Sequence, residues 1–221
     1  MQIFPLSESA LTVEFGNEIS FEFNDKAIAL ASNLRENPFP GMIEAVSAYS
    51  SVTIFYDLAT TKKQQFPTAF ETVKQHVIGV MDNIDSNLSS EHRVVEISVN
   101  FDSKYSLDLA SICEFSGLDP NEVIDIFLSK TYRVYMLGFL PGFAYMGEVD
   151  ERIAAPRLAT PRTKVPKGSV GIAGKQTGIY PFESPGGWQI IGRTDVEMFT
   201  PHKKMPCLLR PGDEIRFVCD N

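Results

Sequence analysis

The uneven distribution of glycine and proline is the feature that most constrains the fold. Residues 136–221 contain 11 of the 15 glycines and 9 of the 14 prolines. Proline removes a backbone donor and glycine favours turns, so long helices are excluded from this part of the chain. From residue 132 onward the chain contains four short apolar runs, YRVYML, VGIAG, WQIIG and EIRFV. Short strand-like runs separated by turn residues predict a compact β-barrel after residue 131.

The earlier part of the chain alternates between two kinds of apolar spacing. A period of two predicts strands, and a period near 3.6 predicts helices. The predicted order is strand, helix, strand, strand, helix, strand, at 9–15, 25–36, 42–49, 51–58, 66–84 and 94–101. This order is typical of the split β-α-β motif of ferredoxin-like domains. The last strand fits either this domain or the next one.

Two short helices are predicted before the glycine-rich part. The first, over 106–117, starts at Ser106 as its cap, and the second, over 119–130, starts at Asp119 followed by Pro120. The segment 86–93 is polar and poor in helix formers, so we predict the domain boundary there. The expected fold class is α+β, with an N-terminal α/β domain over 1–88 and a β-barrel domain over 89–221.

Charge is also divided unevenly. The net charge is −8, which argues against nucleic acid as a partner. Residues 1–150 contain 9 basic and 21 acidic side chains, whereas residues 151–221 contain 11 basic and 7 acidic ones. A basic region on an acidic protein suits a small anion such as a carboxylate or a phosphate. A solvated surface without a ligand explains the same asymmetry equally well.

Several classes of protein are not indicated. No apolar run reaches the roughly 18 residues of a membrane helix, and the N-terminus lacks the pattern of a signal peptide, so we expect a cytoplasmic protein without a membrane partner. The cysteines, Cys113, Cys207 and Cys219, form no C-x-x-C pair, which favours buried, reduced thiols over a zinc site. The three histidines are scattered, and we predict no metal site.

The segment GSVGIAGKQTGIYPFESPGGWQIIGRT at 168–194 raises the possibility of a phosphate-binding loop. A P-loop requires G-x-x-x-x-G-K-[ST] followed by a helix. Ser169 stands where the first glycine would be required, and Gln176 follows Lys175. Pro181 and Pro185 prevent a helix downstream. We therefore expect these glycines to form sharp turns and close strand contacts in the barrel.

Polar side chains lie among these glycines. Strand packing explains the glycines but not these polar side chains. Fixed turns that carry guanidinium, amide and hydroxyl groups form polar pockets on rigid scaffolds. Trp188 suits a wall of such a pocket or a place in the core. The polar side chains are Arg162, Lys164, Lys167, Gln176, Thr177, Tyr180, Ser184 and Arg193.

The same region closely resembles the allophanate hydrolase subunit one, or KipI-like, family, which includes the B subunit of 5-oxoprolinase and the kinase inhibitor KipI. The resemblance rests on GF-x-PGFAY, TPR-x-x-VP-x-GSVGIAG-x-QTGIYP and SPGGWQ-IGRT, in that order within 132–194, and on GLDPNEVI at 117–124. It is weaker over residues 1–90. It implies an N-terminal α/β domain and a C-terminal cyclophilin-like β-barrel.

The resemblance implies an ATP-dependent hydrolase subunit that opens the ring of 5-oxoproline to glutamate and is inactive alone. ATP is bound by the complex, and the implied partners are proteins like the C and A subunits of 5-oxoprolinase. Phosphorylation of the amide oxygen makes the lactam attackable by water, which requires cations and oxyanion donors. The expected catalytic residues are Arg162, Gln176, Tyr180 and Ser184, and the expected substrate-binding residues are Lys164, Lys175, Thr177 and Arg193.

The family also leaves alternatives open. One is a KipI-like inhibitor that binds a sensor histidine kinase, and another is a component of a urea or allophanate amidolyase system. The chain departs from the family pattern at Phe127, where relatives usually carry a histidine. If that histidine takes part in the reaction, the activity of this chain is altered. If it only packs or caps a helix, nothing changes.

Overall fold

The computed structural model describes residues 1–62, 66–84 and 92–220. The chain divides into two compact units, Met1–Glu91 and His92–Asn221. The predicted boundary between residues 88 and 89 lies outside the described residues. No described helix has both the length and the apolar character needed to cross a membrane. The α+β fold class is confirmed.

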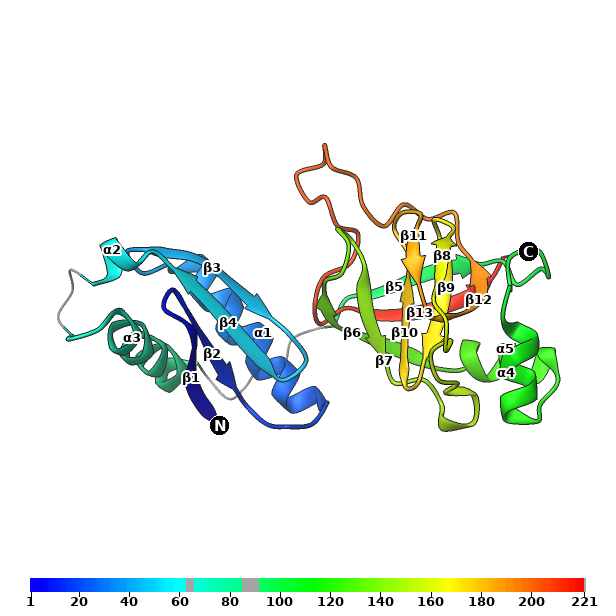
Figure 1. The fold of residues 1–221 in the computed structure, drawn as a ribbon, viewed down its shortest axis with the longest axis horizontal. Helices are drawn as coiled ribbons and strands as arrows, with labels where there is room; N and C mark the ends of the chain where they lie inside the picture. The colour runs from blue at the N-terminus through cyan, green and yellow to red at the C-terminus, as the bar shows by residue number, and fades with distance from the viewer. Residues whose placement is uncertain (63–65, 85–91, 221) are drawn as a thin grey trace. The chain divides into compact units, whose positions relative to one another are not determined.

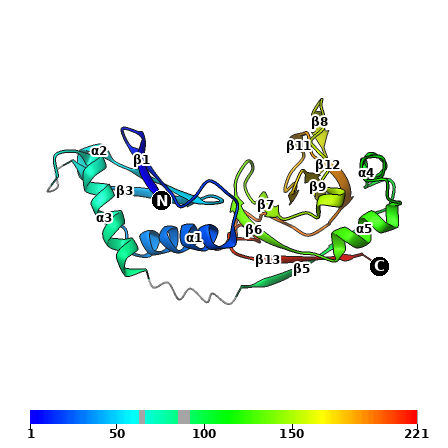
Figure 2. The same cartoon turned by 90° about the horizontal axis from the view of Figure 1, so that it is seen from below.

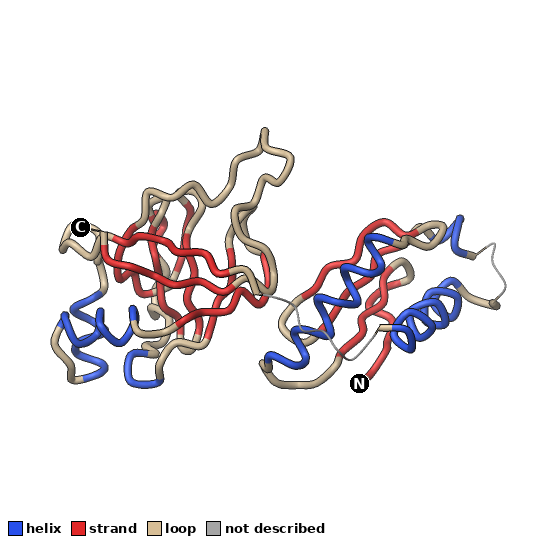
Figure 3. The backbone as a smooth tube through the Cα atoms, turned by 180° about the vertical axis from the view of Figure 1, so that it is seen from behind, coloured by secondary structure: helices blue, strands red, loops and turns tan. Residues whose placement is uncertain are grey.

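The first unit is a four-stranded antiparallel sheet covered by helices. Its strand order is β1-β2-β4-β3, and α1 lies across the strands on one face (Figure 3). Both β2 and β3 pair antiparallel with β4, so β2, α1 and β3 form the predicted split β-α-β unit. The elements are β1 Gln2–Ser7, β2 Ala10–Glu14, α1 Phe21–Glu36, β3 Met42–Ser47, β4 Ser51–Tyr56, α2 Leu58–Thr61 and α3 Ala69–Asn83.

Strand β1 was not predicted, and it occupies the edge of the sheet beside β2. Most of its side chains are exposed and it contains Pro5, so the alternating signal of a half-buried strand is missing. The segment 94–101 does not complete this sheet, because β5, Val94–Val99, pairs with β13 in the second unit. Of the two domains that this strand fits by sequence, it lies in the second unit.

The second unit is built on a seven-stranded sheet with the order β12-β9-β10-β7-β6-β13-β5. The sheet curls until its edge strands meet, where Asn100 and Arg193 exchange backbone hydrogen bonds of 2.8 and 2.9 Å. Strands β8 and β11 form a separate pair (Figure 1). The strands are β6 Thr131–Leu137, β7 Ala144–Gly147, β8 Arg162–Val165, β9 Ser169–Ala173, β10 Gln176–Ile179, β11 Ser184–Gly186, β12 Gln189–Arg193 and β13 Glu214–Cys219.

Two helices, α4 Leu109–Ser116 and α5 Pro120–Leu128, lie together at one end of this sheet, and a short turn of 3₁₀-helix, Glu151–Ile153, contacts them (Figure 2). The predicted start of α5 is confirmed, because Asp119 accepts from two backbone N–H groups and Glu122 completes a capping box. The predicted cap of α4 is wrong. The N-cap residue is Asp108, which makes no capping bond, while the Ser106 hydroxyl donates to the Asp102 carbonyl.

The glycine-rich segment forms strands, as expected from the failed P-loop match. Strands β9 and β10 form a hairpin, and Ala173 pairs with Gln176 across the turn Gly174–Lys175. Gly174 has φ +58°, which suits glycine at this turn. At Gly178 a Cβ atom would lie 2.9 Å from Phe143 and 3.1 Å from Trp188, so the absence of a side chain lets these rings pack against the strand.

The cysteines differ from the prediction. Cys113 and Cys207 are half-buried and Cys219 is exposed, so the expectation of buried thiols is wrong for Cys219. Cys219 ends β13, where the side chains leave the core. All three are free thiols.

Candidate functional site

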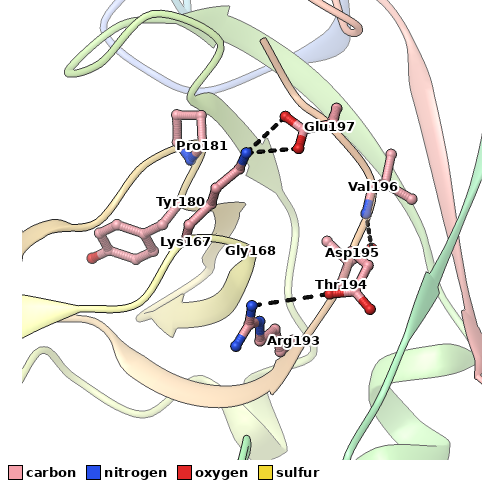
Figure 4. A pocket seen from close by; sticks show the side chains of 9 residues that line it. All are labelled: Lys167, Gly168, Tyr180, Pro181, Arg193, Thr194, Asp195, Val196 and Glu197. Atoms are coloured by element: carbon pink, nitrogen blue, oxygen red, sulfur yellow. Dashed lines mark hydrogen bonds and ion pairs between the residues drawn. The ribbon is translucent and has the colours of Figure 1, made fainter.

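Two hollows with different linings stand out among the described residues. The larger, about 980 Å³, lies on the first unit and is lined mostly by apolar groups such as Leu6, Leu58 and Phe70. The smaller, about 160 Å³, lies on the second unit and contains charged side chains. Charged groups are what binding and proton transfer require, so the smaller pocket is the better candidate. Its lining is Lys167, Gly168, Tyr180, Pro181, Arg193, Thr194, Asp195, Val196 and Glu197 (Figure 4).

Backbone hydrogen bonds join the three segments around this pocket. The Gly168 N–H donates to the Tyr180 carbonyl at 2.7 Å, and the Thr194 N–H donates to the Gly168 carbonyl at 2.9 Å. Gly168 has φ +81°, and a Cβ atom there would lie 2.1 Å from the Thr194 oxygen. Only glycine combines this conformation with this close contact. The pocket therefore depends on a glycine of the predicted loop.

The charges of the pocket are paired. Lys167 Nζ lies 2.7 and 2.8 Å from the two carboxylate oxygens of Glu197. The Arg193 guanidinium lies 4.0 Å from Asp195 and 5.4 Å from the centre of the Tyr105 ring. Arg193 Nε is buried and has no hydrogen-bond partner in the described part of the chain. The pocket thus presents two cations balanced by two carboxylates.

The Tyr180 ring turns away from this pocket (Figure 4) and joins an aromatic cluster. Phe143 lies edge-on to both Tyr180 and Trp188, with each pair of ring centres 5.4 Å apart. Tyr180 is 2% exposed. Burial raises the pKa of its phenol, although a hydrogen bond from the Trp188 backbone N–H and the nearby guanidinium groups oppose this effect. Tyr180 is therefore a neutral phenol at physiological pH.

Arg162 lies on β8 and binds a buried acid. Its two terminal nitrogens lie 2.8 and 2.5 Å from the carboxylate oxygens of Asp108, which is 4% exposed. The same carboxylate accepts the Ile190 N–H at 2.7 Å. This bidentate pair fixes the plane of the guanidinium and leaves its other N–H groups without protein partners in the described structure.

The other predicted site residues lie in two further places. On the β8–β11 pair, Lys164 lies 2.9 Å from Glu183, and the Ser184 hydroxyl donates to the Pro185 carbonyl. At the β9–β10 turn, Lys175 forms an ion pair with Glu151.

Gln176 and Thr177 begin β10 next to that turn. The Thr177 hydroxyl is fully buried and donates to the Gly171 carbonyl. The structure therefore places Arg193 at the pocket, where Tyr180 contributes its backbone and turns its phenol toward β11. It places the other six residues along β8, β11 and the β9–β10 turn.

Two residues of this region were not singled out from the sequence. Asp108 carries no signal beyond its place near a helix start, where Ser106 looked like the better cap. Arg157 lies 5.8 Å from the Trp188 ring centre, in the guanidinium-over-ring arrangement of a cation–π contact. Their contacts connect positions far apart in the chain, Asp108 with Arg162 and Arg157 with Trp188.

Phe127 is a core residue of this unit. It is fully buried, with its ring 5.0 Å from that of Phe217 and 5.1 Å from that of Tyr132. The Tyr132 hydroxyl also donates to the Phe127 carbonyl at 2.8 Å. In this chain the position packs the helix α5 against the sheet.

Comparisons with known proteins agree with this architecture. The profile of the family described as "Carboxyltransferase domain, subdomain C and D" matches residues 1–209. The chain is 44% identical over 220 residues to the 5-oxoprolinase B subunit of Bacillus subtilis, and the match covers 98% of this chain and 92% of that protein. It is 26% identical to "Urea amidolyase" of Saccharomyces cerevisiae, over 93% of this chain but 12% of that protein.

A solved structure, that of TTHA0988, superimposes with a TM-score of 0.83 at 36% identity, covering 96% of this chain. This chain spans 40% of the length of that solved chain. The family profile and the identity over nearly the full length confirm the predicted resemblance. The chain belongs to the family of carboxyltransferase subdomain C and D proteins, together with the 5-oxoprolinase B subunits.

Proposed function

We propose that this chain is a subunit of an ATP-dependent 5-oxoprolinase, which converts 5-oxoproline, ATP and water to glutamate, ADP and phosphate. The observation that carries the proposal is the 44% identity to a 5-oxoprolinase B subunit, which extends over nearly all of both chains. The similarity to a urea amidolyase is lower and covers a small part of that larger protein, so an amidolyase role ranks second. A kinase-inhibitor role has no separate support from the described site.

We propose that the protein works with C-like and A-like subunits, in the cytoplasm, and that the complex binds ATP. The relatives' name describes one subunit among several, and in the solved relative this region makes up 40% of a longer chain. A site that another polypeptide completes also fits a pocket of only about 160 Å³ at the surface of the second unit. The finer fold names, ferredoxin-like and cyclophilin-like, stay predictions of the resemblance.

The chemistry of the proposed reaction suits the groups on the second unit. Hydrolysis of an unstrained lactam needs its amide oxygen activated, for which transfer of phosphate from ATP provides a route. Developing negative charge is stabilised by fixed donors and cations. Tyr180 supplies a neutral phenol, and Arg162 supplies an oriented guanidinium. We keep Gln176 and Ser184 as proposed catalytic residues, and Lys164, Lys175, Thr177 and Arg193 as proposed substrate-binding residues.

The test is reconstitution. The chain is mixed with candidate C-like and A-like subunits, 5-oxoproline and ATP, and glutamate is measured over time. We expect ATP-dependent glutamate only when all subunits are present, and a loss of at least about 100-fold when Arg162 is replaced by Ala. The matched control is Arg152→Ala, since Arg152 is exposed and pairs with its neighbour Asp150. Glutamate formation that does not require this chain contradicts the proposal, as does the absence of glutamate when all subunits are present.

A further inference from the structure

The four cations among the predicted site residues are all paired within the chain. A guanidinium or ammonium beside a carboxylate attracts a second anion less strongly, because the partner charge opposes it. A residue that lacks such a partner is therefore a better anion-binding candidate. The four pairs are Arg162–Asp108, Lys164–Glu183, Lys175–Glu151 and Arg193–Asp195.

Arg157 differs from these four cations. It is exposed, and within the described residues no carboxylate lies within ion-pair distance of its guanidinium. The guanidinium carbon lies 5.8 Å from the centre of the Trp188 ring. Next to it, the Leu158 N–H donates to the Gly187 carbonyl at 2.7 Å, which ties this segment to the strand end that carries Trp188. Arg157 is thus an unneutralised cation held over an aromatic ring.

The Trp188 ring beneath Arg157 is buried and packs against other rings. Trp188 is 4% exposed, and its ring packs against Phe143 and Tyr145 at 5.4 and 5.9 Å. Gly186 and Gly187 precede it, and neither presents a side chain. Gly186 pairs with Arg162 across the β8–β11 strands, and a Cβ atom added at Gly186 would collide with the Tyr180 phenol. The segments that carry Arg157, Arg162 and the Tyr180 phenol therefore meet at these two glycines, and both guanidinium groups act on the Tyr180 phenol by lowering its pKa.

The charge of this surface matches a monoanion. Asp108 cancels the charge of Arg162, so Arg157 leaves one positive charge uncompensated. A carboxylate carries one negative charge and is planar, which suits two parallel N–H bonds from a guanidinium. We infer that Arg157, stacked on Trp188, binds the carboxylate of a small lactam acid. This deepens the proposed function and rests on it, because it names the group that holds the 5-oxoproline ring beside Arg162 and Tyr180.

Trp188 makes the inference directly measurable, since it is the single tryptophan of the chain. Its fluorescence is followed while 5-oxoproline is added to the full chain at constant ionic strength. We expect a saturable change whose dissociation constant rises about tenfold or more in Arg157→Ala, the loss of one charge-assisted interaction. Arg157→Lys retains the charge without the planar fork, so it should fall between the two.

Two probes and one variant serve as controls. The uncharged lactam 2-pyrrolidone has the ring without the carboxylate, so any response to it should not depend on Arg157. Inorganic phosphate tests the other source of anionic oxygens, and an Arg157-dependent response to phosphate with none to 5-oxoproline would assign the surface to phosphate and overturn the carboxylate inference. Arg152→Ala, another exposed arginine, should bind 5-oxoproline as the unaltered chain does.

An equal response in Arg157→Ala and the unaltered chain, or no response in the unaltered chain, overturns the inference. In the reconstituted complex, the inference predicts that Arg157→Ala raises KM for 5-oxoproline by the same factor. Glutamate formation with an unchanged KM contradicts the role of Arg157 and leaves the proposed function standing. Arg157-dependent binding without glutamate formation supports the role of Arg157 and contradicts the proposed function.

Discussion

The two units of the chain differ in the kind of polar group that they bury. In the described part of the first unit the buried polar side chains are uncharged, such as Asn24 and Thr61. The second unit buries Asp108, Arg133 and Asp213. Burying a charge is costly unless it is paired and hydrogen-bonded. Buried charged side chains therefore mark places where the fold holds a fixed geometry at a cost in folding free energy. Among the described residues these places lie in the second unit.

In the second unit the buried carboxylates connect segments that are far apart in the sequence. Asp108 binds Arg162 and the Ile190 N–H, so it joins the start of α4 to β8 and β12. Asp213 accepts from Arg93 and from the Arg210 N–H, so it joins β5 to the start of β13. In the first unit, Asn24 instead donates to the carbonyls of Ala48 and Tyr49 in one turn. The comparison predicts different costs for removing these groups.

The largest expected loss of stability comes from the core of the second unit. Phe127→Ala removes a fully buried ring that contacts several others, which should cost about 4 kcal/mol. Urea unfolding and peptide-level hydrogen exchange measure the loss and its location. Exchange should rise in residues 92–220 and stay near that of the unaltered chain in the first unit. The matched change Leu30→Ala should act in the opposite unit, at about 3 kcal/mol. Equal exchange changes in both units would remove the distinction between them.

Removing the buried carboxylate comes next. Asp108→Ala leaves the Ile190 N–H and the Arg162 guanidinium without this partner, which should cost about 3 kcal/mol. Asp102→Ala is the control, since that carboxylate is exposed and its nearest cation lies at 3.9 Å. Chemical denaturation should show less than about 0.5 kcal/mol for the control. A similarly small loss in Asp108→Ala would mean that the buried Asp108–Arg162 pair stabilises the fold no more than an exposed carboxylate does.

The corresponding amide of the first unit should matter less. Asn24→Ala removes two hydrogen bonds to backbone carbonyls, which should cost about 2 kcal/mol. The same denaturation experiment measures it, and Asn24→Asp tests the sign of the effect, because a carboxylate in place of the donor amide should destabilise further. A loss equal to or larger than that of Asp108→Ala would contradict the ranking of charged above neutral buried groups.

The smallest expected effect is a pH dependence confined to the first unit. Burial lowers the pKa of His76 below its ordinary value of 6.5, and its ring lies 5.0 Å from that of Phe39. The unfolded chain therefore binds more protons just below pH 6.5, so this residue's contribution is present above that pH and is lost as pH falls. His76→Gln should flatten the stability of the first unit between about pH 7 and 5. An identical pH profile in the variant would show that His76 contributes nothing.

Local patterns predicted much of the fold because their physical causes are local. The start of α5 is set by Asp119, Pro120 and Glu122, because they cap the first turn of the helix themselves. Gly174 makes the β9–β10 turn, and Pro181 prevents a helix after it. Strand β1 escaped prediction because edge pairing leaves its side chains exposed. The cap of α4 was misassigned because the Asp108 carboxylate binds Arg162, 54 residues away, instead of its own helix.

The sequence alone determined the family, the alternation of strands and helices, and the presence of polar groups among the glycines of the second unit. The family follows from the resemblance of its motifs, and the order of elements follows from spacing and local backbone preferences, which depend only on the order of residues. Tertiary structure decided which of the described cations near the candidate site are paired and which are not, because an ion pair depends on distance in space. In the sequence, nothing distinguishes Lys164, Lys175 and Arg157 as paired or unpaired cations. Only the folded chain places Glu183 and Glu151 beside the first two and an indole ring beside the third.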